Sequence, residues 1–314
     1  MKRVGALSMF TTVQQPMTQG RNGSIDLLRL VAALGIVDFH LGGPLAAIGY
    51  AGLPVFAALM GYNAIRRTGS EKGRQALVTQ ARQLALLWLV WSAIYGALKV
   101  AEVVAARHSP ADEFAAWMLL TGPAIHLWFL PFAALTLLGL RRAGGWLTPG
   151  SEAGFVRGAG LAAAVSLAAF GLSAQPGLPI PLPQWLYVAP ALAFGVLLAF
   201  AGDDRRRQAI WLVSAVATVL LGSRFGPPGA AFTLLLALSA IGLAMAVRLP
   251  QTPASDLARR LSMAIYLLHP MMVAVLLRLT HWPSGSAPML PAVLLGTGGL
   301  ALLLLRSPLR RWAG

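Results

Sequence analysis

The 314-residue sequence contains no cysteine, which excludes disulfide bonds, a thiolate nucleophile and thiolate metal ligands. Charged residues make up only 11% of the chain, against about a quarter in a typical soluble domain. Hydrophobic residues make up 57%, and they come in runs long enough to cross a bilayer. The sequence therefore predicts an integral membrane protein.

Several catalytic and binding motifs are also missing. The chain has no P-loop, no glycine-rich dinucleotide fingerprint, no HExxH and no GxSxG nucleophile elbow. Its five histidines are scattered, so no metal site is predicted. The first twenty residues lack a long apolar core and a small-residue cleavage site, so no cleaved signal peptide is expected.

Acidic residues are scarce beside basic ones, with 10 Asp and Glu against 25 Lys and Arg and a net charge of +15. Such a charge can indicate nucleic-acid binding, but here the basic residues form short clusters between apolar runs. That distribution is typical of loops that set the orientation of a membrane protein. We therefore expect the protein to contact membrane lipids and not to bind nucleic acid.

The apolar runs predict an all-α polytopic membrane protein with about ten transmembrane helices. No repeat, linker or soluble domain interrupts them, so residues 1–314 are expected to form one membrane domain, with residues 1–23 as a polar cytoplasmic segment. The ten predicted segments are 25–42, 47–65, 84–101, 124–140, 158–173, 185–201, 208–222, 229–247, 261–279 and 288–305.

The positive charges predict the orientation of this domain. With a cytoplasmic N-terminus, twenty Lys and Arg residues fall on the cytoplasmic side and four on the other. The asymmetry and the even helix count place both termini in the cytoplasm. Residues 66–83, rich in Arg and Lys, are expected to form a long cytoplasmic loop broken by Gly69 and Gly73.

The most informative stretch is SIDLLRLVAALGIVDFH, residues 24–40, an apolar helix that carries four ionisable residues. Such residues are costly in a membrane and indicate function. Since each helical residue turns about 100°, Arg29 and His40 share one face about three turns apart. Asp26 lies on the same face and can pair with Arg29. Asp38 points the other way, and an interhelical pair is expected for it.

His40 and Arg29 each allow two interpretations. A neutral imidazole at membrane depth suits general-base catalysis, but it can also simply hydrogen-bond to another helix. The guanidinium of Arg29 can clamp a phosphate or carbonyl group, but it can also extend to the headgroups while it pairs with Asp26. Their shared face favours function.

Further polar positions lie later in the chain. His126 and Trp128 open the fourth predicted helix, where Trp128 is expected to anchor the membrane interface. His269 lies midway along the ninth helix before Pro270, where packing around a kink and function are both open. The basic residues of 66–83 are a topology signal that would also suit a polyanionic cytosolic ligand.

Four blocks of the sequence resemble membrane-bound acyltransferase family 3. The first is the arrangement of Asp26, Arg29 and His40, with ten residues between the last two. The others follow in the same order, and the resemblance covers most of the chain: AGLPVFAALMGYN (51–63), HLWFLP (126–131) and SMAIYLLHP (262–270). The second block departs from the family pattern: the family usually has a Val-Asp or similar pair before the aromatic residues and Ser-Gly after them, and this sequence has Leu53, Pro54 and Met60, Gly61 there.

The resemblance implies transfer of an acyl group, commonly acetyl, from acyl-coenzyme A to a hydroxyl of a carbohydrate or lipid-linked glycan, in a bacterial inner membrane. His40 would be the base and Arg29, paired with Asp26, would orient the donor. The late block makes Tyr266 and His269 further candidate site residues. Coenzyme A would be held by Arg66, Arg74 and Arg82, with His126 and Trp128 lining its pocket.

Two other functions remain open from the sequence. A transporter of a glycan, lipid or small anion would use Arg29 and His40 to bind substrate and couple protons. The second alternative is a non-catalytic partner in an envelope-polysaccharide complex. It stays open because the second block departs from the family pattern.

Overall fold

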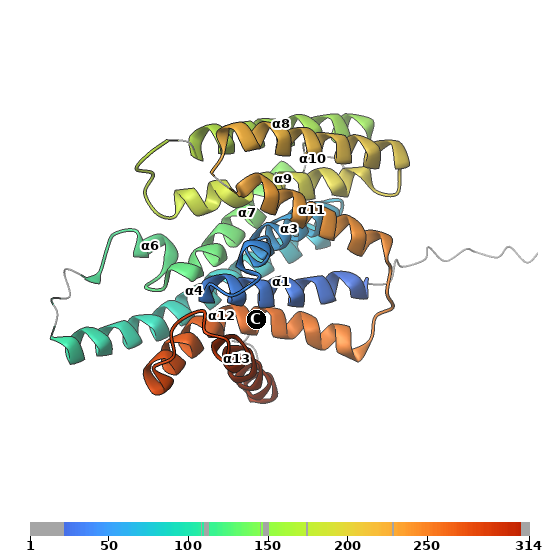
Figure 1. The fold of residues 1–314 in the computed structure, drawn as a ribbon. Coiled ribbons are helices and arrows are strands. Elements are labelled where there is room, and N and C mark those ends of the chain that lie inside the picture. The colour runs from blue at the N-terminus through green and yellow to red at the C-terminus, as the bar shows by residue number, and fades with distance from the viewer. Residues whose placement is uncertain are drawn as a thin grey trace, which may run out of the picture.

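The computed structural model describes residues 22–308 except 108, 110–112, 145, 147–150, 174 and 228, and in these residues it contains helices and no strand (Figure 1). Most of the predicted N-terminal segment 1–23 thus lies outside the described residues. The elements are α1 (Gly23–Leu41), α2 (Ala46–Gly49), α3 (Gly52–Thr68), α4 (Glu71–Ala106), α6 (Met118–Thr121), the 3-10 turn η1 (Ile125–Trp128), α7 (Phe129–Ala143), α8 (Glu152–Ser173), α9 (Leu182–Ala201), α10 (Arg205–Phe225), α11 (Ala230–Ala246), α12 (Pro253–Thr280) and α13 (Met289–Arg306).

Each predicted apolar segment corresponds to a helix of at least 15 residues, so ten such helices occur among the described residues. Six spans are long and apolar enough to cross a membrane: Ala46–Thr68, α4, α8, α9, α12 and α13. Helix α11 is apolar but has only 17 residues, and α1 carries three charged residues. Length and composition therefore support six spans, and the count of ten crossings stays a prediction.

The prediction of a long loop over residues 66–83 is wrong. Only Gly69 and Ser70 separate α3 from α4, which begins at Glu71. The hydroxyl of Ser70 accepts a hydrogen bond from the Gly73 amide, and Glu71 pairs with Arg74 one turn later. An N-cap and an i,i+3 ion pair start the helix, and Leu77 and Ala81 then bury a narrow apolar face of this mostly polar segment.

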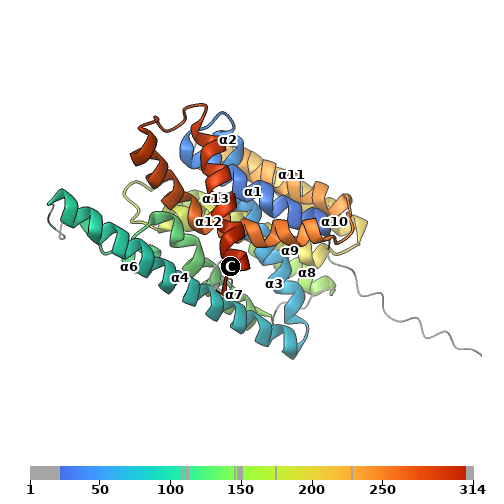
Figure 2. The ribbon, with the colours of Figure 1, turned by 90° about the horizontal axis from the view of Figure 1, so that it is seen from below.

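The helices pack in two layers. In Figure 1, α8, α9, α10 and α11 lie above, and α1, α12 and α13 lie below, with α3 and α7 between them; Figure 2 shows the lower layer from beneath. Small residues allow α3 to pack closely on α9: a Cβ on Gly195 would lie 1.9 Å from the Ala58 carbonyl oxygen, and one on Gly61 2.5 Å from that of Leu192. Such contacts are the usual way for membrane helices to approach one another.

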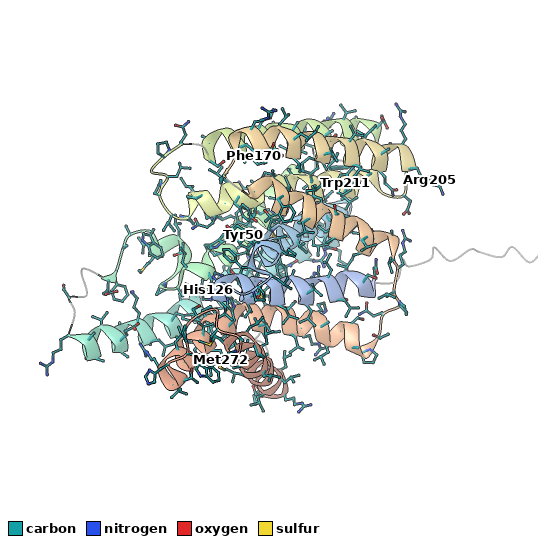
Figure 3. The ribbon with its side chains drawn as sticks, in the orientation of Figure 1. Tyr50, His126, Phe170, Arg205, Trp211 and Met272 are labelled. Atoms are coloured by element: carbon teal, nitrogen blue, oxygen red, sulfur yellow. The ribbon has the colours of Figure 1, made fainter. Side chains whose placement is uncertain are left out.

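Successive long helices run in alternating directions, so the connections gather at two ends of the bundle (Figure 1). One end, here named the arginine-rich end, carries the start of α1, the α3–α4 turn, the α9–α10 turn and the α11–α12 connection. The end of α1 and the turn η1 lie toward the opposite end. Arg66, Arg205 and Arg248 belong to the arginine-rich end, and Figure 3 labels Arg205 there.

The start of α1 is fixed to the α11–α12 connection. The Asn22 side chain donates a 2.7 Å hydrogen bond to the Ala244 carbonyl, and the Gly23 amide donates to that of Leu249 at 3.0 Å. A Cβ on Gly23 would lie 2.5 Å from the Pro250 carbonyl oxygen, so only glycine fits. These contacts fix where α1 begins relative to α12.

Candidate active site

Three histidines from distant parts of the sequence lie together in the lower layer. His40 is in the last turn of α1, His126 in η1 and His269 in the middle of α12. The ring centroids of His40 and His269 are 5.2 Å apart, and those of His126 and His269 are 5.6 Å apart. Figure 3 labels His126 beside α1 and α12. The three rings form one group, which we name the histidine cluster.

The backbone around Pro270 fixes the tautomer of His269. Proline has no N–H, so the Tyr266 carbonyl oxygen lacks its ordinary helical donor. His269 Nδ1 lies 2.9 Å from this oxygen and 3.2 Å from that of Ile265. Since carbonyl oxygens only accept, Nδ1 carries the proton and Nε2 carries the lone pair. Nε2 is buried and has no hydrogen-bonding partner among the described residues.

His126 is held by two tyrosines. Its ring is T-shaped to that of Tyr95, with the centroids 5.0 Å apart, and its backbone carbonyl accepts a hydrogen bond from the Tyr266 hydroxyl. The Tyr95 hydroxyl donates to the Leu267 carbonyl at 2.8 Å. These bonds tie α4, η1 and α12 together. His126 Nε2, like that of His269, is buried without a partner among the described residues.

Tyr95 was not predicted from the sequence. It lies in a run of apolar and aromatic residues, WLVWSAIYG (88–96), which reads as an ordinary lipid-facing helix. Its contact with His126 depends on how α4 packs against η1, and no local pattern encodes that packing.

His40 is the exposed member of the histidine cluster. His126 and His269 are 5% and 0% exposed, whereas the His40 side chain is open to solvent or substrate on one side and contacts Phe39 at a centroid distance of 5.4 Å on another. A substrate would therefore meet His40 first, with His269 behind it.

Asp26 and Arg29 form the ion pair expected from their spacing. Arg29 Nη1 lies 3.2 Å from Asp26 Oδ1, and Gln251 Nε2 donates to Asp26 Oδ2 at 3.3 Å. The Arg29 side chain is 24% exposed. His40 lies eleven positions after Arg29, or about 16 Å along the helix. Arg29 thus lies on the line to the histidine cluster but too far away to touch it.

The arginines expected to hold coenzyme A lie at the arginine-rich end. Arg66 donates to the Tyr62 hydroxyl one turn earlier in α3. Arg74 is paired with Glu71 at 2.6 Å and also donates to the Thr68 carbonyl at 3.1 Å. Arg82 is exposed on α4, about 12 Å further along the axis. The structure thus places Arg66 and Arg74 at the α3–α4 turn and Arg82 about three turns into α4.

Trp128 does not anchor a membrane interface as expected. It is 5% exposed and packs against Phe129 and Phe132, with ring centroids 5.6 and 6.1 Å away. The chain turns through η1 at this point instead of beginning the helix, and this carries the indole into the core. Trp128 therefore supports the turn that presents His126.

The interhelical pair expected for Asp38 is also wrong. The side chain is 5% exposed, yet neither carboxylate oxygen has a hydrogen-bonding partner among the described residues. It lies against the chain reversal after α1, where a Cβ on Gly43 would come within 1.9 Å of Asp38 Oδ1. The loop covers Asp38 before another helix can reach it.

The geometry suits proton transfer. An exposed imidazole next to a buried imidazole, His269, that retains a free lone pair can take a proton from a substrate and share it. Among the described residues, no group of three His, Cys, Asp or Glu side chains is placed to hold a metal ion.

Comparison with known proteins gives a match to one family. The model of acyltransferase family 3, described as an acyltransferase domain, matches residues 22–306, which is most of the chain. No curated protein and no solved structure matches. Together with the apolar helices, this match identifies a multi-pass membrane protein.

Proposed function

Because the chain belongs to acyltransferase family 3, we propose that it moves an acyl group, acetyl in the first instance, from acyl-coenzyme A to a hydroxyl of a cell-surface or lipid-linked carbohydrate. The acyltransferase family is established by the match; the donor, the acceptor and the residue roles are the proposal. The bacterial inner membrane, with the arginine-rich end in the cytoplasm, is the setting we propose.

The observation that carries this proposal is the histidine cluster. In the proposed reaction, His40 takes the proton of the acceptor hydroxyl as its oxygen attacks the thioester carbonyl carbon. A carbon–oxygen bond forms, the carbon–sulfur bond breaks, and coenzyme A leaves as a thiolate that the proton then neutralises. His269 Nε2, which is kept unprotonated, is proposed to take up the proton from His40, whose ring lies 5.2 Å away between centroids.

The donor is proposed to enter from the arginine-rich end. Coenzyme A carries phosphates, which the guanidinium groups of Arg66, Arg74 and Arg82 can bind, and Arg29 lies between that end and the histidine cluster. His126 lines the inner end of this route. Trp128 supports His126 from within the core. The acceptor would reach His40 from the opposite end.

Release of acetyl from surface glycans tests the proposal. A strain lacking the gene is complemented with the wild type or with His40→Ala, at matched abundance in the membrane. Loss of glycan O-acetyl in the deletion strain, restored by the wild type alone, is the expected result. Full restoration by His40→Ala would reject His40 as the base and favour a transporter or a non-catalytic partner.

A further inference from the structure

A large cavity lies at the arginine-rich end, in the other layer from the histidine cluster. It has a volume of about 810 Å³, is open on one side and is bounded by α3, α9, α10 and α11. This volume is within the range of small-molecule binding sites, roughly 300–1,000 Å³. Trp211, which Figure 3 labels in the upper layer, forms part of its wall.

The cavity is long and its inner walls are apolar. On α11 the lining runs from Leu235 to Ala246, about 17 Å along the axis. Trp211 supplies an aromatic wall, and its indole N–H is already bound to the Phe194 carbonyl at 3.0 Å. A Cβ on Gly242 would meet no atom within 4 Å, so the space beside α11 is open. An extended hydrocarbon chain fits such a wall.

One side of the cavity carries exposed apolar side chains. Leu212 of α10 and Leu243 of α11 both line it, and they are 55% and 65% exposed. Exposed leucines on helices of a membrane domain lie against lipid chains. We therefore expect a hydrocarbon chain to reach the cavity past these two leucines without crossing the bundle.

The mouth of the cavity is polar and carries cations. Arg66 and Arg248 line it, and both are exposed. Arg248 also forms a 3.0 Å ion pair with Asp203, in which both side chains are more than 60% exposed. Two guanidinium groups against one carboxylate leave a net positive charge at this end, which favours an anionic headgroup.

The cavity and the histidine cluster share no lining residue. The lining residues come from α3, α9, the α9–α10 turn, α10, most of α11 and the α11–α12 connection, and none comes from α1, η1 or α12. An acyl donor held here would have its thioester in the wrong layer.

We propose that this cavity binds an anionic membrane phospholipid, with its phosphate at Arg248 and a hydrocarbon chain along Trp211 and Gly242. The proposal does not depend on acyl transfer at the histidine cluster. The lipid fills space that the four helices leave between them, and it holds α10 and α11 against α3.

Native mass spectrometry of the delipidated full-length protein tests this proposal, with phosphatidylglycerol and phosphatidylcholine as the probes. Phosphatidylglycerol is expected to bind and phosphatidylcholine to bind at least fivefold less. Gly242→Leu should abolish most binding, because its side chain would occupy the space beside α11 in which the hydrocarbon chain is proposed to lie. Gly160→Leu, on an exposed face of α8 where a Cβ also meets no atom within 4 Å, is the matched control and should bind like the wild type.

The mouth is tested by Arg248→Gln, which should weaken phosphatidylglycerol binding about fivefold, and by Asp203→Asn, which should strengthen it. Equal binding of the two lipids, or undiminished binding in Gly242→Leu, would overturn the proposal. Displacement of the phospholipid by palmitoyl-coenzyme A, with a raised KM for the acyl donor in Gly242→Leu, would also overturn it and assign the cavity to the donor.

Discussion

His269 Nδ1 lies 2.9 Å from the carbonyl oxygen of Tyr266, the oxygen that Pro270 leaves without its helical donor. The missing backbone hydrogen bond at Pro270 thus determines which nitrogen of the His269 ring carries the proton. Nε2 of His269 keeps its lone pair and lies within the histidine cluster, whose exposed member is His40. The sequence motif that places a histidine directly before a proline has a physical reason here.

Pro270→Ala should separate stability from activity. Alanine supplies the missing amide to the Tyr266 carbonyl and has a higher helix propensity than proline. The free energy of unfolding should therefore rise by up to about 3 kcal/mol. His269 Nδ1 then loses one of its two acceptors, and acyl transfer should fall. Thermal unfolding in detergent and the initial rate of transfer measure the two effects. An unchanged rate would show that the tautomer of His269 has no role.

Asp38→Asn should stabilise the protein. The Asp38 carboxylate is buried and without a partner among the described residues, and a buried charge in that state is costly. Removing the charge should raise the free energy of unfolding by about 1 kcal/mol. Asp26→Asn is the contrasting variant, because it breaks the pair with Arg29 and should lower that free energy by about 2 kcal/mol. Equal effects of the two substitutions would contradict this account.

Tyr95→Phe should impair catalysis more than stability. It removes the hydrogen bond to the Leu267 carbonyl, worth about 1 kcal/mol, and frees α12 to shift against η1. The rate should fall because the spacing of His126 and His269 changes. Tyr187→Phe is the matched control, since it removes a 2.8 Å bond to Thr233 outside the histidine cluster. If both variants lose activity equally, Tyr95 acts only on stability.

Arg29→Lys should raise the KM for acetyl-coenzyme A about tenfold and change kcat much less. Lysine keeps the charge but loses the two-pronged geometry by which a guanidinium holds Asp26 and an anionic donor together. Steady-state kinetics measure both constants, with Arg278→Lys at the opposite end of the bundle as the control. A fall in kcat alone would place Arg29 at the reacting atoms instead.

The sequence predicted the ten helices because each has its own apolar run, and it predicted the Asp26–Arg29 pair because helical spacing determines which residues meet. It did not predict the first part of α4. That segment is mostly polar, and hydropathy alone does not distinguish a polar helix from a loop. Ser70 as an N-cap and Glu71 in the first turn are the features of the sequence from which the start of this helix could have been predicted.

The candidate site was predictable in its parts but not in its assembly. His40, His126 and His269 could each be singled out, but spacings of 86 and 143 residues say nothing about whether they meet. Their contact follows from the packing of α1, η1 and α12. Trp128 and Asp38 were misjudged because a turn replaced a helix end at one and a loop covered the other.

The most direct test of the central claim is label transfer from [14C]acetyl-coenzyme A to the glycan fraction of inverted inner-membrane vesicles. Vesicles with wild type, His40→Ala and His281→Asn are compared at equal protein; His281 is an exposed residue at the end of α12, outside the histidine cluster. The account predicts that His40→Ala loses about a hundredfold or more of the transfer rate, while His281→Asn keeps it. Transfer by His40→Ala at the wild-type rate would contradict the account.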